Sequence, residues 1–344
     1  MNKMFLIGKN LQELENLCLE HKFPKFHGIQ IYKWLYQKNI DDINLMSNIP
    51  DKLKNILNHS YTINSISIDK TQSSKVDKTI KFLLKTKDNK FIECVSMIDK
   101  GRHTICISSQ IGCSVDCNFC ATGKMGIIRN LEIGEILNQL TIIINEVKKT
   151  ITNIVFLGMG EPFLNYNNVI ESCKILTDTK AFNFSSRKIT ISTSGILPKI
   201  EQFIKNKEKY KLAISLNASN NNIRNKLIPI NKKWPIEKLL GALKKYKFHK
   251  YRPIMFEYIL LKGVNDKKEH ANELIKLLKN INCKINIIPY NQIDSQYKRA
   301  DTDSIINFTK IIQECKYNLK VFIRWSKGQD IDAGCGQLAT KNEK

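Results

Sequence analysis

The chain has 344 residues, of which 42% are hydrophobic, so a large core can form and wholesale disorder is excluded. No apolar run approaches the roughly 20 residues that a membrane span needs, and the apolar part of residues 1–9 is too short for a signal peptide. These features predict a cytosolic protein, in which thiols stay reduced. The net charge of +23 predicts a polyanionic partner, most simply RNA or DNA.

Residues 1–65 are predicted to form a small helical domain without a catalytic signature. Apolar residues recur at three- and four-residue intervals in residues 11–19 and 28–37. Aromatic and basic residues interleave around Tyr32 and Trp34, a composition that binds RNA by stacking and charge. The same aromatics would also suit the core of a small helical domain, and the pattern leaves both alternatives open.

Residues 66–102 are predicted to form a linker and a β-hairpin. Apolar and polar residues alternate in residues 79–86 and 91–98, on either side of a plausible turn at residues 87–90.

From residue 103 to about 325 the pattern repeats strand and then helix. Strands are predicted at residues 104–108, 153–157, 188–193, 211–216, 254–261, 284–289 and 320–323, and helices at 132–148, 166–176, 236–246, 267–278 and 305–315. This alternation predicts an α/β fold with a parallel sheet, whose working surface lies at the carboxyl ends of the strands. Periodicity does not decide whether the sheet closes into a barrel.

Cys113, Cys117 and Cys120 follow the first of these strands with the spacing Cys-x3-Cys-x2-Cys. Four thiolates bind a 4Fe–4S cluster in electron-transfer proteins, so three thiolates leave one iron open for chemistry. Zinc sites usually combine two separated Cys-x2-Cys halves, and neither a second pair nor a histidine within the loop is present here. The spacing therefore favours a cluster over zinc.

Residues 158–162, with the sequence Gly-Met-Gly-Glu-Pro, follow the second strand. The glycines allow a ligand to approach the backbone, and Glu161 could accept hydrogen bonds from a cationic amino group. A tight turn with a solvated acid is the alternative.

The segment 199–250 is the most basic part of the chain, with 14 Lys and Arg residues against three acidic ones. Such a segment is typical of nucleic-acid binding. An AT-biased coding sequence would also enrich lysine, asparagine and isoleucine, so the composition leaves both explanations open.

Three segments together closely resemble the radical-SAM adenine methyltransferases: residues 106–123 with the cysteine motif, residues 158–162, and residues 330–338 with the sequence Asp-Ile-Asp-Ala-Gly-Cys-Gly-Gln-Leu. Within that group the chain is most similar to the dual-specificity RNA enzymes that act on carbon 2 of adenine, from its helical N-terminus to Leu338. The resemblance implies a radical-SAM partial (β/α)6 barrel at 103–325, an N-terminal RNA-binding accessory domain, a β-hairpin extension, and a C-terminal segment at 326–344. It also implies one 4Fe–4S cluster on three cysteines and two S-adenosylmethionine molecules per turnover.

The resemblance further implies contacts with S-adenosylmethionine. They fall on Gly160, Glu161, Ser192, Ser215, Leu216, Asn217 and Asn291. Position 217 is commonly histidine in the family, so a side-chain contact there is in doubt, whereas a backbone contact would survive the change.

Three catalytic residues follow from the same resemblance. Cys335 would carry the methyl group, in a loop that reads Ala-Gly-Cys where many relatives read Ala-Ala-Cys, a change expected to loosen the loop. Cys106 would resolve the intermediate through a transient disulfide with Cys335. Glu93 would accept a proton, although a hairpin glutamate is more often a surface residue. Structural roles are expected for Cys18, Cys94 and Cys283, and for Cys173 and Cys315 in apolar periodic stretches.

The chemistry explains why a radical is needed: adenine carbon 2 has no lone pair with which to attack an electrophilic methyl group. The implied reaction methylates Cys335 from one S-adenosylmethionine and uses a second to generate a radical on that methyl group. Addition to carbon 2 gives a protein–RNA adduct, which Cys106 releases. The implied substrates are an adenine in 23S rRNA at the peptidyl-transferase centre and one beside the anticodon in tRNA, with a reductant such as flavodoxin. The sequence leaves the oligomeric state open, and a monomer is the default expectation.

Three alternatives remain at this point. Methylation of carbon 8 would use the same cysteines, but Pro162 fits the carbon 2 branch better. An activase that places a glycyl radical on a protein would not need Cys335 or a strongly basic surface. An iron–sulfur electron carrier or an RNA-binding module would leave the open iron and two further cysteines unexplained.

Overall fold

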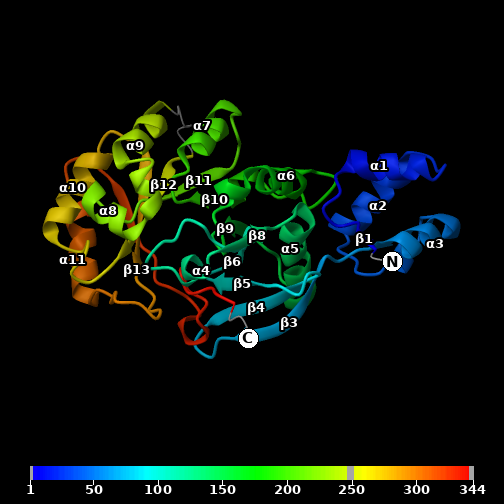
Figure 1. Ribbon diagram of the computed structural model, residues 1–344, viewed down its shortest axis with the longest axis horizontal. Coiled ribbons are helices and arrows are strands. Elements are labelled where there is room, and N and C mark those ends of the chain that lie inside the picture. The colour runs from blue at the N-terminus through cyan, green and yellow to red at the C-terminus, as the bar shows by residue number, and fades with distance from the viewer. Residues whose placement is uncertain (1–2, 246–251, 341–344) are drawn as a thin grey trace.

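The structure is a computed structural model that describes residues 3–245 and 252–340. Its N-terminal part is a small helical unit at one end of the long axis of the molecule (Figure 1). The unit contains α1 (Leu11–Glu20), α2 (Phe26–Tyr36), the 3-10 helix η1 (Ile43–Leu45) and α3 (Asp51–Ser60), and the short strands β1 (Met4–Phe5) and β2 (Tyr61–Thr62) pair in parallel. The helical prediction for this region is confirmed.

The aromatic residues of α2 mainly build the core of this unit. Tyr32 and Tyr36 are buried, and the Tyr32 hydroxyl donates a hydrogen bond to Asp178 at 3.0 Å. Trp34 is half-buried against the core, and its indole N–H donates to Asn48. Stacking of Tyr32 on RNA is therefore excluded by its burial.

An antiparallel extension follows, made of β3 (Ile66–Ser73), β4 (Lys78–Thr86) and β5 (Phe91–Asp99). The predicted hairpin is β4–β5, and its turn places Asn89 in the left-handed region at φ 55°. Strand β3 was not predicted because it is an edge strand, exposed along most of its length, and so lacks the alternation of a half-buried strand.

Seven parallel strands continue the same sheet. They are β6 (Arg102–Ile107), β9 (Asn153–Phe156), β10 (Ile189–Thr193), β11 (Lys211–Ser215), β12 (Ile254–Leu260), β13 (Cys283–Pro289) and β14 (Lys320–Ile323). Strand β6 joins the two parts because it pairs antiparallel with β5 and parallel with β9. In the described residues the sheet has ten strands with β14 and β3 at its edges, so the predicted partial barrel is confirmed.

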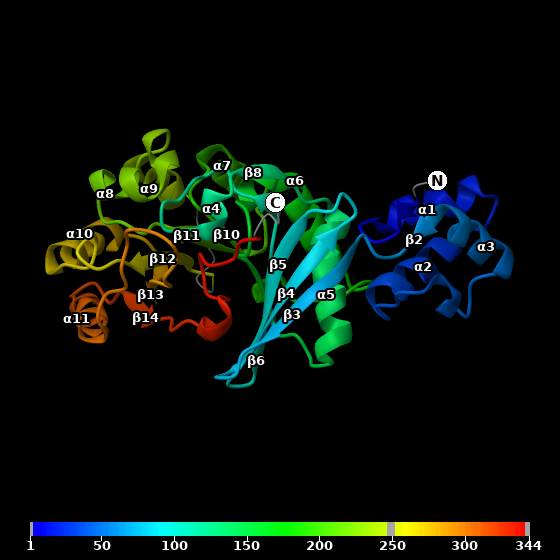
Figure 2. The ribbon, with the colours of Figure 1, turned by 60° about the horizontal axis from the view of Figure 1, so that its bottom comes forward.

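Helices cover the outside of the curved parallel sheet (Figures 1 and 2). They are α5 (Ile133–Val147), α6 (Tyr166–Thr177), α7 (Leu197–Lys205), α9 (Ile236–Lys245), α10 (Lys268–Leu278) and α11 (Thr302–Gln313). Shorter pieces connect them: β7 (Gln110–Gly112), α4 (Ala121–Lys124), β8 (Ile127–Asn130), η2 (Pro162–Asn165), η3 (Ser186–Lys188), α8 (Asn221–Leu227), η4 (Pro229–Lys232) and η5 (Gln329–Ile331). The predicted end of α9 at residue 246 lies outside the described residues. No helix in the described ranges is both long and apolar enough to cross a bilayer.

The C-terminal segment returns to the carboxyl ends of the parallel strands. Figure 1 shows it in red beneath α4, running toward β4 and β5. The amide of Ala121 in α4 donates to the carbonyl of Gly336 at 2.7 Å, and Thr122 donates to the carbonyl of Leu338. These contacts hold Cys335 beside the loop that carries the cysteine motif.

Candidate active site

A cavity opens at the carboxyl ends of the parallel strands and brings most of the predicted site residues together. Its lining includes Cys113, Cys117, Cys120, Gly160, Glu161, Ser192, Ser215, Asn217 and Cys335. Leu216 and Asn291 do not line it directly. Cys106 lines a neighbouring cavity that also contains Cys335, and Glu93 lines neither.

The three motif cysteines lie in the loop between β7 and α4, and close backbone approaches set its shape. The amide of Cys120 donates to the carbonyl of Cys117 at 3.0 Å. A Cβ at Gly112, where φ is 74°, would lie 1.8 Å from the carbonyl oxygen of Gly126, so only glycine fits there. Buried Val115 and Phe119 pack in an apolar cluster with the end of α8 and with residues from β12 and β13 onward, which anchors this loop to the barrel.

The three motif thiols come from one short loop and line one wall of the same cavity. Closely spaced cysteines of this kind are the usual ligands of a 4Fe–4S cluster. Burial raises the pKa of Cys113 to about 12, so binding of iron would release protons from this loop.

The Gly-Glu pair after β9 forms a tight turn whose acid is buried. Gly160 has φ 96°, and a Cβ there would lie 2.5 Å from Gln110 Cβ. Glu161 is 2% exposed, with Oε1 accepting from the amide of Phe163 at 2.9 Å and Oε2 from that of Ser194 at 2.7 Å. Burial raises the pKa of Glu161, while these amides oppose the rise. The alternative of a solvated acid is therefore wrong.

Asn217 follows β11 and is held mainly by the protein itself. It occupies the left-handed region at φ 55°, which asparagine tolerates better than most residues. Its Oδ1 accepts from the amide of Ile259 at 2.8 Å, its carbonyl accepts from Asn265, and its amide donates to the carbonyl of Glu257. A contact from Asn217 to a ligand would therefore fall to its Nδ2.

Arg224 organises the ends of β10 and β11 from inside the protein. Its side chain is fully buried and donates to the carbonyls of Leu216 at 3.0 Å, Ser215 at 3.1 Å and Ser194 at 2.6 Å. Burial lowers the pKa of Arg224 to about 10. The backbone at Leu216 is thus held in place while its side chain packs in the core.

Two buried oxygens near the cavity lack a hydrogen-bond partner. They are Oε2 of Glu257 on β12, which lines the cavity, and Oδ1 of Asn291 after β13. Unpaired buried acceptors are costly and call for a donor. The amino group of an adenine and the hydroxyls of a ribose are such donors, so these residues fit S-adenosylmethionine.

Cys335 lies between two cavities. It lines the one with the motif cysteines and also the neighbouring one with Cys106 and Arg324. Burial raises the pKa of Cys106 to about 12 and also raises that of Cys335, which the Arg324 guanidinium opposes. Both residues are free thiols in this structure, so it supports no permanent disulfide between them.

Gly334 lies in a hydrogen-bonded turn of the Cys335 loop. Its amide donates to Oε1 of Gln337 at 3.0 Å, and its carbonyl accepts from the amide of Gln337 at 3.1 Å. A Cβ at position 334 would lie 2.5 Å from Nδ2 of Asn291. Glycine here permits a close approach between Asn291 and the loop.

Glu93 is not the surface residue that its place in a hairpin suggested. It is 5% exposed, and its Oε1 pairs with Nζ of Lys81 at 3.0 Å. Its Oε2 accepts from the amide of Ala339 at 2.9 Å, which ties the C-terminal segment to β5. Burial raises the pKa of Glu93, and Lys81 opposes the rise.

Sequence reasoning missed three charged residues of this region: Arg224, Glu257 and Arg324. The sequence could have indicated Glu257 as a site residue, because it is the single carboxylate in an otherwise apolar strand. Arg224 had none, because it belongs to a segment in which many basic residues suggested a solvated surface. Two other lysines of that segment, Lys247 and Lys250, lie outside the described residues.

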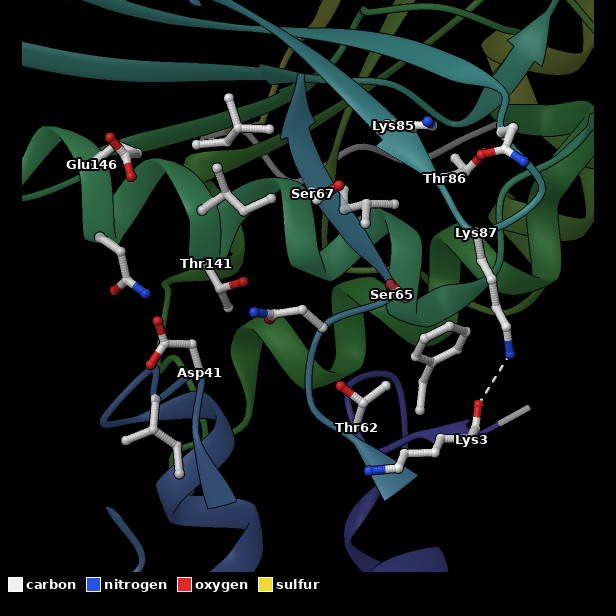
Figure 3. A pocket seen from close by; sticks show the side chains of 18 residues that line it. Lys3, Asp41, Thr62, Ser65, Ser67, Lys85, Thr86, Lys87, Thr141 and Glu146 are labelled. Carbon is white, nitrogen blue, oxygen red and sulfur yellow. Dashed lines mark hydrogen bonds between the residues drawn. The ribbon is translucent and has the colours of Figure 1, made fainter. Parts of the chain in front are cut away.

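A third, more open pocket lies between the N-terminal unit, the antiparallel strands and α5 (Figure 3). Lys3, Lys85 and Lys87 line it together with Asp41 and Glu146. Lys87 donates to the carbonyl of Lys3 at 3.1 Å across it. None of the predicted site residues is among its lining, so it is separate from the cavities around Cys335.

Comparison with known proteins finds relatives along the whole chain. The model of the radical SAM superfamily matches residues 107–278, and that of the ribosomal RNA large subunit methyltransferase N-terminal domain matches residues 4–63. The chain is 40% identical to a probable dual-specificity RNA methyltransferase RlmN of Flavobacterium psychrophilum, over 96% of this chain and 95% of the relative. It is 42% identical to the dual-specificity RNA methyltransferase RlmN of Vesicomyosocius okutanii, over 99% and 96%. A crystal structure of a radical SAM methyltransferase from Sphaerobacter thermophilus matches with a TM-score of 0.93 and 36% identity, over 97% of this chain and 99% of the other.

Proposed function

Because this chain belongs to the RlmN family of dual-specificity RNA methyltransferases, within the radical SAM superfamily, we propose that it methylates carbon 2 of adenine in 23S rRNA and in tRNA. The observation that carries the proposal is the position of Cys335. This thiol lines one cavity with the three motif cysteines and a second cavity with Cys106. A methyl carrier needs that position, between the site where the methyl group is activated and the site where RNA receives it.

The enzyme uses S-adenosylmethionine and a 4Fe–4S cluster. Cys113, Cys117 and Cys120 are the proposed ligands of the cluster, which leaves one iron for S-adenosylmethionine. When bound, these groups supply the methyl group and the radical chemistry, two S-adenosylmethionine molecules being used per turnover. The protein supplies position, exclusion of water and two thiols.

The residues around the cavity are proposed to bind the parts of S-adenosylmethionine. Glu161 and the backbone at Gly160 would hold its amino-acid end, because the carboxylate oxygens can accept further hydrogen bonds from an ammonium group. Ser192, Ser215 and Nδ2 of Asn217 offer polar contacts along the same wall. Oδ1 of Asn291 would accept from the adenine amino group, and the backbone at Leu216 supports the wall.

Cys335 and Cys106 are proposed to carry and release the methyl group. Cys106 is buried and Cys335 is half-buried, and Arg324, which lines the cavity that they share, favours the thiolate of Cys335. Attack of the Cys106 thiolate on the sulfur of Cys335 would break the bond between that sulfur and the carbon attached to RNA. The electron pair of this bond stays with the carbon, which takes up a proton and becomes the methyl group of the product. The two sulfurs are thereby oxidised to a disulfide, which a thiol reductant must return to two thiols before the next turnover.

Glu93 is proposed to accept the proton from carbon 2. Its burial supports this role, because desolvation raises the pKa of the carboxyl against the opposing Lys81 ion pair, and a higher pKa makes the carboxylate a stronger base. Its hydrogen bond to the amide of Ala339 links it to the loop of Cys335. A protein reductant such as flavodoxin and a monomeric state complete the proposal.

Nucleoside mass spectrometry tests the function directly. Ribosomal and transfer RNA would be taken from cells that lack their own enzyme and express this chain. We expect 2-methyladenosine in both pools, and its presence in one pool would limit the substrate to that RNA. The finding of 8-methyladenosine, or of neither product from protein with an intact cluster, would overturn the proposal.

A further inference from the structure

Trp325 is an exposed aromatic residue at the edge of the cavity that contains both reactive thiols. It lies two residues after the end of β14 and lines this cavity with Cys106, Arg324 and Cys335. Its side chain remains 44% exposed. Burying an indole would stabilise the protein, so a tryptophan that stays exposed at a reaction cavity suggests a role in binding a ligand.

Packing does not account for Trp325 as it does for the two other tryptophans. Trp34 and Trp234 are both packed against the main hydrophobic core. Trp325 belongs to neither of the apolar clusters that the described residues form. Core packing therefore does not explain the position of Trp325.

Arg299 holds the indole ring in place. Its guanidinium carbon lies 5.8 Å from the ring centroid, in cation–π contact. Arg299 is itself anchored, because it forms a β-bridge with Leu261 and the neighbouring carbonyl of Lys298 accepts from the amide of Lys262 at 2.9 Å. The ring is thus oriented before any ligand arrives, which lowers the entropy cost of stacking.

The surroundings of Trp325 are cationic. Arg324 and Lys327 line the same cavity, and Lys327 is paired with Asp99 at 3.3 Å. An exposed indole with a cation over its ring, at the edge of a reaction cavity, is a surface that single-stranded nucleic acid recognises by stacking of bases. An adenine whose ring atoms react must leave any stack or pair, so its neighbours in the strand pass the edge of the cavity unpaired.

We propose that Trp325, oriented by Arg299, is a stacking platform for an unpaired nucleobase next to the target adenine. The proposal rests on the proposed function, since it requires RNA at Cys335, and adds a subsite for the flanking nucleotide. The subsite recognises a base by its face, so it contributes affinity for unpaired RNA with little discrimination among bases.

Fluorescence tests the contact. The variant with Trp34→Phe and Trp234→Phe keeps Trp325 as its one tryptophan, since the chain has three. We expect saturable quenching of its emission by a single-stranded RNA oligonucleotide that contains the target adenine. The matched control keeps Trp234 instead, through Trp34→Phe and Trp325→Phe, because Trp234 also carries a cation over its ring, Lys233 at 5.0 Å. Unchanged Trp325 emission at RNA concentrations that saturate filter binding would overturn the proposal.

Kinetics separate stacking from a structural role. Trp325→Ala is expected to raise the KM for RNA roughly 5- to 100-fold, and Trp325→Phe to restore most of the affinity because it keeps an aromatic face. Cleavage of S-adenosylmethionine without RNA, and the KM for RNA of Trp234→Ala, should stay at the wild-type value. An unchanged KM for RNA in Trp325→Ala, with wild-type methylation intact, would overturn this inference alone. A wild-type enzyme that neither binds nor methylates RNA would overturn the proposed function and the inference with it.

Discussion

The side-chain amide of Asn291 donates a hydrogen bond to the main-chain carbonyl of Cys335, 3.1 Å away and 44 positions further along the chain. The other atom of the same amide group, Oδ1, is buried without a partner. One residue therefore holds the loop of the proposed methyl carrier and offers an acceptor to a ligand. Gly334 makes the contact possible, since a side chain at that position would collide with Asn291.

Substitution Asn291→Ala is expected to weaken the binding of S-adenosylmethionine about tenfold, because one hydrogen bond to a buried partner is lost. It should also slow methylation of Cys335 by releasing its loop. Equilibrium dialysis on reconstituted protein measures the first effect and mass spectrometry of the protein the second. Asn280→Ala, at an exposed position after α10, is the matched control. Wild-type affinity in Asn291→Ala would contradict the assignment of Oδ1.

Alanine at Cys113, Cys117 or Cys120 is expected to abolish the cluster and all activity, because a cubane bound by two thiolates is poorly held. Iron and sulfide analysis with visible absorption after anaerobic reconstitution measures this loss. Cys335→Ala should keep the cluster and lose methylation. Cys173→Ala, which alters a buried thiol of α6, should keep both. A full cluster in any of the three motif variants would show that another residue is a ligand.

Cys106→Ala is expected to trap a covalent complex between the protein and RNA through Cys335, because no thiol remains to release it. A band of protein with retarded mobility, sensitive to ribonuclease, measures the complex. Cys94→Ala is a stringent control because Cys94 is a buried thiol on the adjacent strand β5. Trapping by both variants, or by neither, would count against Cys106 as the resolving residue.

Glu93→Gln separates two roles of the glutamate. Glutamine keeps an oxygen that can accept from the amide of Ala339, so the C-terminal segment should stay anchored. If Glu93 accepts the proton from carbon 2, this variant should form the RNA complex and fail to complete turnover. Lys81→Met is the companion variant, expected to lower the free energy of unfolding by about 3 kcal/mol because it leaves a buried charge without its partner. Normal turnover in Glu93→Gln would assign the residue to anchoring alone.

The ion pair of Asp88 predicts loss of stability in acid. Arg129 hydrogen-bonds to both carboxylate oxygens of Asp88, at 2.9 and 2.7 Å, and holds the pKa of that carboxyl well below its ordinary value. A lowered folded-state pKa stabilises the protein above the unfolded-state pKa of about 4, and this stabilisation is lost as the pH falls toward the folded-state pKa.

Thermal unfolding followed by circular dichroism from about pH 6 to pH 3 measures this effect. The wild-type midpoint should fall more steeply with acidification than that of Asp88→Asn, which lacks the ionisable group. Asp69→Asn, on the exposed edge strand β3, is the matched control and should follow the wild type. Equal slopes in wild type and Asp88→Asn would contradict the prediction.

The parallel strands were predicted to within two residues because each is a short apolar run bounded by polar residues. Strand β3 was not predicted because this edge strand is almost entirely exposed and so shows no alternation of apolar and polar residues. Among the site residues, the three motif cysteines share one short loop, so their proximity is a local property that spacing alone reveals. The burial of Glu93 and Arg224 could not be predicted from the sequence. Glu93 lies in a hairpin and Arg224 in a basic segment, where charged side chains are usually solvated.

The sequence by itself determined the seven parallel strands, five of the helices that follow them, the class of cofactor and the family, because these depend on local periodicity and short motifs. Only the tertiary structure decided which distant residues meet at Cys335. Asn291, Arg324 and Cys106 reach it from three different strands or their ends, and Trp325 reaches the edge of the same cavity. Such contacts depend on how parallel strands align their carboxyl ends and on how the chain returns across them, which no local pattern encodes.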